Sequence, residues 1–138
     1  MTDLKLYQEF VTEVTSAESK LNYAFMDRFE QLCNYQEDNT LINPSLLITA
    51  ALGLAAESGE FCEIPKKMFF QGKPLTAENV FHMKRELGDI MWYWINACTA
   101  LKLDPQEVID ENIKKLESRY PGGSFDAWHS ENRKKDDL

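Results

Sequence analysis

Residues 46–60 read LLITAALGLAAESGE, an almost unbroken apolar run that ends in two glutamates three positions apart. Alanine and leucine dominate the run, and both residues strongly favour the helix. A helix that is apolar on every side must be covered by its own domain or by another subunit. We therefore expect a central helix in an all-α fold, starting after the restart signal at Asn43-Pro44 and ending at about Lys67.

A second apolar stretch, ELGDIMWYWI at residues 86–95, also carries two acids three positions apart. Apolar residues at helical spacing predict a helix here, capped by Thr76 and ending at about Leu101. Gly72 and Pro74 mark the intervening loop. The two helices should form an antiparallel hairpin. At about 1.5 Å of rise per residue, their acid pairs would lie at similar distances from the loop.

Helical spacing also extends to both sides of this hairpin. Residues 1–33 are expected to be mostly helical, with an interruption between Lys20 and Asn22. Asp104-Pro105-Gln106-Glu107 has the cap, proline and glutamate of a helix start, and that helix should end at Tyr120-Pro121. Together the pattern predicts a helical bundle around a central hairpin that carries a metal site. Helices that are apolar on all sides in so small a chain also predict oligomerisation, as a homodimer or a dimer of dimers.

Length and charge limit the remaining possibilities. The 138 residues are 43% hydrophobic, which predicts one domain over residues 1–138, with a core at about 4–125 and a frayed tail at 130–138. A net charge of -8 argues against a nucleic-acid polymer as partner. The start of the chain lacks a signal-peptide pattern and the apolar runs fall short of about 20 residues. We therefore expect no membrane partner and a cytoplasmic location, with Cys33, Cys62 and Cys98 as reduced core thiols.

Four carboxylates, Glu57, Glu60, Glu86 and Asp89, form the candidate site. Residues three apart share one face of a helix, so each pair can point at one ion. An unpaired carboxylate in apolar surroundings is costly, and a divalent cation would compensate for that cost. One such pair alone is common on solvated surfaces, but two at matched height on adjacent helices form a much stronger signal. Oxygen-only ligands favour Mg²⁺, with Mn²⁺ as a substitute.

These motifs resemble a known family. The chain is similar to the MazG-type all-α nucleoside triphosphate pyrophosphohydrolases in three features. It has an ExxE motif at Glu57 and Glu60 and an ExxD motif at Glu86 and Asp89, and 25 residues separate the two motifs. The third feature is Asn112-Ile113-Lys114-Lys115-Leu116, followed by Arg119-Tyr120-Pro121. The resemblance spans roughly residues 46–125. It implies Mg²⁺-dependent hydrolysis of nucleoside triphosphates, deoxynucleotides or modified nucleotides, to the monophosphate and pyrophosphate. The four acids match the family's metal ligands, and Glu57 and Glu60 are the candidate catalytic residues, either of which could be the general base.

The substrate would need further contacts, and we expect six of them: Lys67, Tyr93, Asn96, Asn112, Lys115 and Arg119. Positive charges suit phosphate, and Asn112 matches the family's asparagine. A solvated basic face explains each basic residue equally well, and plain core packing explains Tyr93 equally well. Pro65 predicts a kink or helix end near Ile64, which would change the direction in which Lys67 points.

Two other readings compete with this one. A non-catalytic helical protein that binds a nucleotide or a partner would use the acids for ion pairs with Arg85, Lys66 and Lys67. A di-iron oxidase is disfavoured, because the Glu-x-x-His pairs of such bundles are missing.

Overall fold

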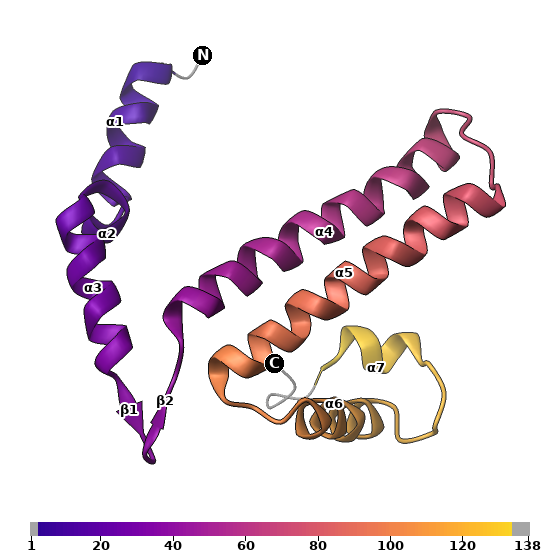
Figure 1. The fold of residues 1–138 in the computed structure, drawn as a ribbon. Coiled ribbons are helices and arrows are strands. Elements are labelled where there is room, and N and C mark those ends of the chain that lie inside the picture. The colour runs from indigo at the N-terminus through magenta and orange to yellow at the C-terminus, as the bar shows by residue number, and fades with distance from the viewer. Residues whose placement is uncertain (1–2, 134–138) are drawn as a thin grey trace.

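The structure is a computed structural model that describes residues 3–133, and helices form most of it (Figure 1). The elements are α1 (Leu4–Val14), α2 (Ala17–Lys20), α3 (Asn22–Asn34), β1 (Gln36–Glu37), β2 (Thr40–Leu41), α4 (Pro44–Phe70), α5 (Ala77–Leu101), α6 (Pro105–Arg119) and α7 (Ala127–Glu131). The predicted all-α class is confirmed, with one small two-stranded sheet in addition.

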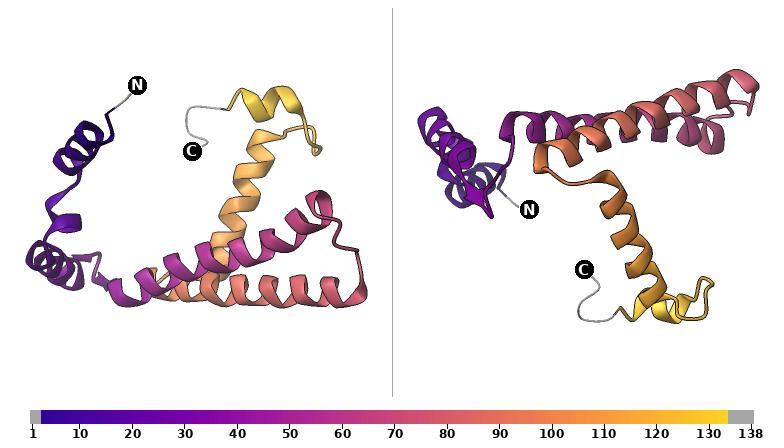
Figure 2. Two further views of the ribbon diagram at one scale, coloured as in Figure 1. Left: turned by 90° about the horizontal axis from the view of Figure 1, so that it is seen from above. Right: turned by 60° about the horizontal axis from the view of Figure 1, so that its bottom comes forward.

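The centre of the fold is the hairpin of α4 and α5, which lie side by side in every view (Figures 1 and 2). Side-chain caps fix where each helix starts. The Asn43 oxygen accepts a hydrogen bond from the Leu46 N–H at 3.1 Å, and the Thr76 hydroxyl accepts one from the Asn79 N–H at 3.2 Å. The Asn43 N–H also donates to the Ala100 carbonyl at 2.8 Å, which ties the start of α4 to the end of α5. The predicted hairpin is therefore confirmed.

A helix end near Ile64, one of the two predicted effects of Pro65, is wrong, because α4 continues through the proline to Phe70. A proline inside a helix removes one backbone hydrogen bond and crowds the carbonyl four residues earlier. Both Ile64 and Pro65 are half-buried. The helix α4 packs against α5, and this packing can offset the free-energy cost of one lost backbone hydrogen bond.

The chain before α4 forms an N-terminal arm, residues 4–41, that stands away from most of the hairpin and contacts it between α3 and α4 (Figure 2). Its helices break at Thr15–Ser16 and at Leu21, which confirms the predicted interruption. Asp38 and Asn39 have φ values of 49° and 61°, as a type I′ turn between β1 and β2 requires.

The C-terminal part begins where Lys102, at φ 59°, ends α5 in a left-handed cap. From there α6 projects away from the hairpin and barely touches it (Figure 2). The short helix α7 starts at Asp126, whose side chain accepts from the His129 N–H at 2.8 Å and lies 2.9 Å from His129 Nδ1. These bonds hold the pKa of Asp126 below its usual value. Residues 130 and 131 belong to α7, and residues 134–138 of the predicted frayed tail lie outside the described residues.

Very little of the described chain is buried. The buried hydrophobic residues are Ala50, Cys98 and Ala100. Cys33 and Cys62 are exposed, so the expectation of core thiols is correct for Cys98 and wrong for the other two. By length and composition alone, α4 could cross a membrane. A helix that is covered by other protein surfaces has the same length and composition.

Candidate metal centre

Three of the four predicted carboxylates meet between the two helices of the hairpin. One oxygen from each of Glu57, Glu60 and Glu86 lies within 4.8 Å of the others. Glu57 and Glu60 are one helical turn apart on α4, and Glu86 faces them from α5. The hairpin therefore places the two motifs at the same height, as their spacing from the loop predicts.

The cluster carries unfavourable electrostatics in the absence of a cation. The pKa of Glu57 is raised, first by its partial removal from water and then by the charges of Glu60, Asp89 and Glu86. A hydrogen bond with the Glu86 side chain raises it further. Several carboxylates that face one ionisable group at short range form the charge pattern that a divalent cation neutralises.

Asp89 lies beside this cluster but is not part of the group of oxygens within 4.8 Å. It is close enough to repel the charge of Glu57, and its side chain is exposed. A small rotation about its side-chain bonds is the kind of adjustment that ligand binding often produces. Its role as a fourth metal ligand remains a prediction.

A cleft of about 300 Å³ opens next to the cluster, on the side of the α4–α5 loop. Glu60 and Glu86 line its inner part. The other described residues that line it are Glu63, Ile64, Lys73, Asn79 and His82. The carboxylate cluster thus opens onto an acidic cleft whose volume can accept more than an isolated ion.

Two of the predicted substrate contacts have other partners within the chain. Lys67 Nζ lies 3.1 Å from Glu63, and Lys66 pairs with the other oxygen of the same carboxylate. These contacts lower the pKa of Glu63. Tyr93 packs against Gly53, so closely that a Cβ built on this glycine would lie 2.2 Å from the tyrosine ring. In the chain alone, therefore, Lys67 forms ion pairs and Tyr93 packs between the helices.

The remaining predicted contacts are not brought to the cluster by this chain. Asn96 is half-buried on α5, two turns beyond Asp89 and away from the cleft. Asn112, Lys115 and Arg119 lie on α6, which projects from the hairpin, and they do not line the cleft. Their substrate roles remain predictions that depend on what packs against this chain.

Several residues of the cleft are not among the predicted site residues. His82 lies one helical turn before Glu86 on α5, and that spacing could have identified it. Glu63 continues the three-residue spacing of Glu57 and Glu60, and that spacing could have identified it. Lys73 and Asn79 belong to the loop and to the start of α5, and no periodic pattern in the sequence signals their position.

Comparisons with known proteins agree with this geometry. Over 73 residues, the chain is 34% identical to the Gene 37 protein of Mycobacterium phage L5. The aligned segment covers 52% of this chain and 64% of the phage protein. The chain thus matches less than two thirds of the length of that relative. No solved structure matches this chain. The family model of the MazG nucleotide pyrophosphohydrolase domain matches residues 47–124, which include all four acids. This match spans more than half of the chain, so the chain belongs to the MazG nucleotide pyrophosphohydrolase domain family.

Proposed function

We propose that this protein hydrolyses nucleoside triphosphates to the monophosphate and pyrophosphate, with deoxynucleotides or modified nucleotides as the expected substrates and Mg²⁺ as the cofactor. The observation that carries the proposal is the meeting of Glu57, Glu60 and Glu86 within 4.8 Å, inside the segment that the family model matches. Mn²⁺ should substitute for Mg²⁺, because both ions prefer oxygen ligands.

The residues present fit a divalent cation. All of the clustered donors are carboxylate oxygens, and their mutual repulsion raises the pKa of Glu57. Glu57, Glu60 and Glu86 would hold the ion, with Asp89 as the predicted fourth ligand. When bound, Mg²⁺ neutralises phosphate oxygens and lowers the pKa of a coordinated water.

The reaction itself needs a proton acceptor and a leaving group. A water molecule adds to the α-phosphorus, the bond from this phosphorus to the bridging oxygen breaks, and pyrophosphate leaves. The proton of the water passes to a carboxylate of the first pair, Glu57 or Glu60. A carboxylate held beside other acids is a better proton acceptor than an isolated one, because its pKa is higher.

We also propose that the chain works as a homodimer or a dimer of dimers. A folded monomer of 16.0 kDa should expose about 7,400 Å², whereas this chain exposes 11174 Å². The excess is roughly 3,800 Å², and an obligate dimer interface buries about 1,000–2,500 Å² on each subunit. An excess of this size favours more than one interface. Such an assembly is also what would bring Asn112, Lys115 and Arg119 to a cleft.

The activity is tested by incubating the protein with each NTP and dNTP plus Mg²⁺ and measuring pyrophosphate. We expect release from at least one nucleotide, and loss by about 100-fold or more in Glu60→Gln and in Asp89→Asn. Circular dichroism should show unchanged helicity in both variants. Glu117→Gln, an exposed change on α6, is the matched control and should retain activity. Absence of release from every nucleotide by a folded protein would reject the proposal and favour the non-catalytic reading.

A further inference from the structure

The cleft next to the metal-binding carboxylates extends towards the loop between α4 and α5. Glu60 and Glu86 line its inner end, and Lys73 and Asn79 line it near the loop. Asn79 and Glu86 are two helical turns apart on α5, which corresponds to roughly 10 Å. A ligand held at the carboxylates can therefore extend along the cleft as far as Lys73.

The charges that line the cleft indicate which part of a nucleotide can bind in it. Among the described residues that line it, Lys73 alone carries a fixed positive charge. Lys66 and Lys67, the other cations near this end of α4, are engaged with Glu63. An anionic group that extends beyond the metal site would therefore find its opposite charge at Lys73.

The loop holds Lys73 in place through backbone and side-chain hydrogen bonds. The Lys73 N–H donates to the Lys67 carbonyl at 3.1 Å, next to Gly72 at φ 69°. The Asn79 side-chain amide donates to the Pro74 carbonyl at 2.7 Å, and Asn79 is only 8% exposed. A binding group on a loop fixed in this way loses little freedom when it meets its ligand.

The direction of the nucleotide follows from the rest of the lining. Ile64 is the one apolar side chain among the described lining residues, so this end of the site offers little surface for a base to stack on. Beyond Glu86, in the direction away from the loop, α5 carries the exposed aromatic ring of Trp92. The phosphates therefore fit the loop side of the cluster, and the nucleoside fits the other side.

We propose that Lys73 binds the terminal phosphate of the substrate, which leaves as part of pyrophosphate. The inference rests on the proposed function and deepens it, because it gives the triphosphate a direction and adds a binding residue outside the metal ligands. Lys73 is a phosphate-binding residue, and Asn79 positions it through the Pro74 carbonyl.

The test measures the binding of inorganic tripolyphosphate in Mg²⁺ by calorimetry, with Lys73→Met and Lys73→Arg as variants. A charge-assisted phosphate contact predicts a Kd about ten-fold higher or more in Lys73→Met, with Lys73→Arg within about three-fold of the wild type. Lys84→Met is the matched control. This variant removes the same charge from α5. Lys84 is two residues from both His82 and Glu86, so it lies on another face of the helix. The Kd for tripolyphosphate should therefore not change in Lys84→Met.

The inference is overturned if the wild type does not bind tripolyphosphate or if the Kd is unchanged in Lys73→Met. It is also overturned if Lys73→Arg or Lys84→Met loses as much affinity as Lys73→Met. The hydrolysis assay reports separately on the proposed function. If Lys73→Met hydrolyses nucleotides with an unchanged KM, the proposed reaction is supported and the role of Lys73 is rejected. If tripolyphosphate binding depends on Lys73 but no nucleotide is hydrolysed, the phosphate site is supported and the proposed reaction is rejected.

Discussion

Partial removal from water raises the pKa of Glu57, and the repulsion of Glu60, Asp89 and Glu86 raises it further. In Glu57→Gln this repulsion disappears and one of the predicted metal ligands is lost. We expect the variant to melt at a higher temperature than the wild type without divalent cations, and to gain little from Mg²⁺. The wild type should gain stability with Mg²⁺, since a ligand that binds only the folded state raises the melting temperature. Thermal melts with and without Mg²⁺ measure both effects, and an equal Mg²⁺ shift in the two proteins would contradict the metal site.

The raised pKa of Glu57 also predicts the direction of a pH effect. Between the ordinary value of 4.5 and the raised value, the folded state holds more protons at Glu57 than the unfolded state does. Raising the pH through this window therefore lowers the free energy of unfolding. Without divalent cations, the wild type should lose stability relative to Glu57→Gln as the pH rises above 4.5. Urea denaturation of both proteins at several pH values, with a chelator present, measures the difference, and parallel pH profiles would contradict the prediction.

Residues at this scale differ in how well sequence predicts them. Glu57, Glu60 and Glu86 could be found from the sequence, because helical spacing fixes which acids share a face and the loop fixes their height. Lys73 could not, because its position depends on a loop conformation that Gly72 and Asn79 set. A loop residue has no period from which its neighbours can be inferred.

At the scale of elements, the hairpin depends on one close approach between α4 and α5. A Cβ at Gly53 would lie 2.2 Å from the Tyr93 ring, whereas one at Gly59 would have no neighbour within 4 Å. Glycine costs a helix about 1 kcal/mol relative to alanine at either position. Gly59→Ala should therefore stabilise the protein by up to about 1 kcal/mol. Gly53→Ala should destabilise it by about 1–3 kcal/mol, because the ring must move.

Urea denaturation of the two glycine variants compares the same chemical change in one helix. Opposite signs are expected, and the double variant Gly53→Ala with Tyr93→Leu should recover part of the loss by giving the new methyl group room. Equal stabilisation by both glycine changes would show that Tyr93 does not lie against Gly53. It would also restore Tyr93 as a candidate substrate contact.

Helix boundaries illustrate what local sequence decides. Asn43, Thr76 and Asp104 each cap the helix that their sequence predicts, because a cap depends only on residues within one turn. Pro65 does not end α4, because packing along α5 is a property of the hairpin and not of the residues around the proline. Local signals thus locate where these helices begin, while tertiary contacts decide how far α4 continues.

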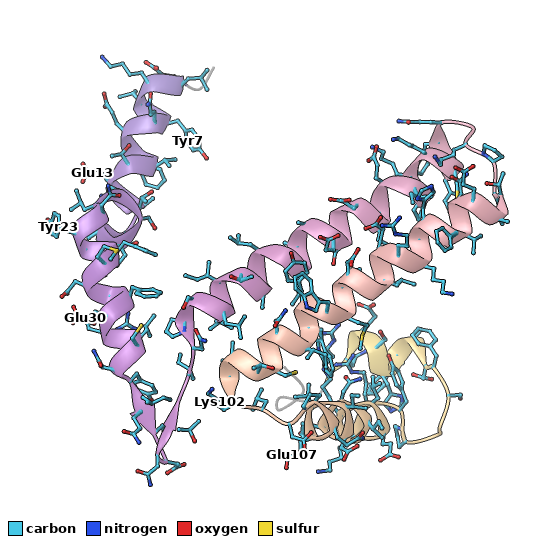
Figure 3. The ribbon with its side chains drawn as sticks, viewed as in Figure 1. Tyr7, Glu13, Tyr23, Glu30, Lys102 and Glu107 are labelled. Atoms are coloured by element: carbon cyan, nitrogen blue, oxygen red, sulfur yellow. The ribbon has the colours of Figure 1, made fainter. Side chains whose placement is uncertain are left out.

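At the scale of the whole molecule, the N-terminal arm and α6 stand away from the hairpin and leave large apolar side chains uncovered. Figure 3 shows Tyr7 on α1 and Tyr23 on α3 projecting into open space, and these residues are 55% and 74% exposed. A bundle was expected from the sequence, but apolar periodicity shows only that a face is covered and not which chain covers it. The arm also lies outside the segment that the family model matches, residues 47–124. We therefore predict that the proposed assembly, rather than this chain alone, covers the arm.

A substitution at Leu52 can test which surface covers α4, because Leu52 lies within the apolar run of this helix and is 68% exposed in the single chain. A glutamate there should cost an isolated chain little, as surface substitutions are usually within about 0.5 kcal/mol. Buried at a subunit interface, the same charge would be expensive. We expect Leu52→Glu to shift the protein from a dimer or tetramer to smaller species in sedimentation analysis. Ser124→Glu, which adds the same charge at another exposed position, should leave the assembly intact. A monomeric wild type would reject the assembly, and a wild type that floats with lipid vesicles would instead identify the apolar run of α4 as a membrane-binding surface.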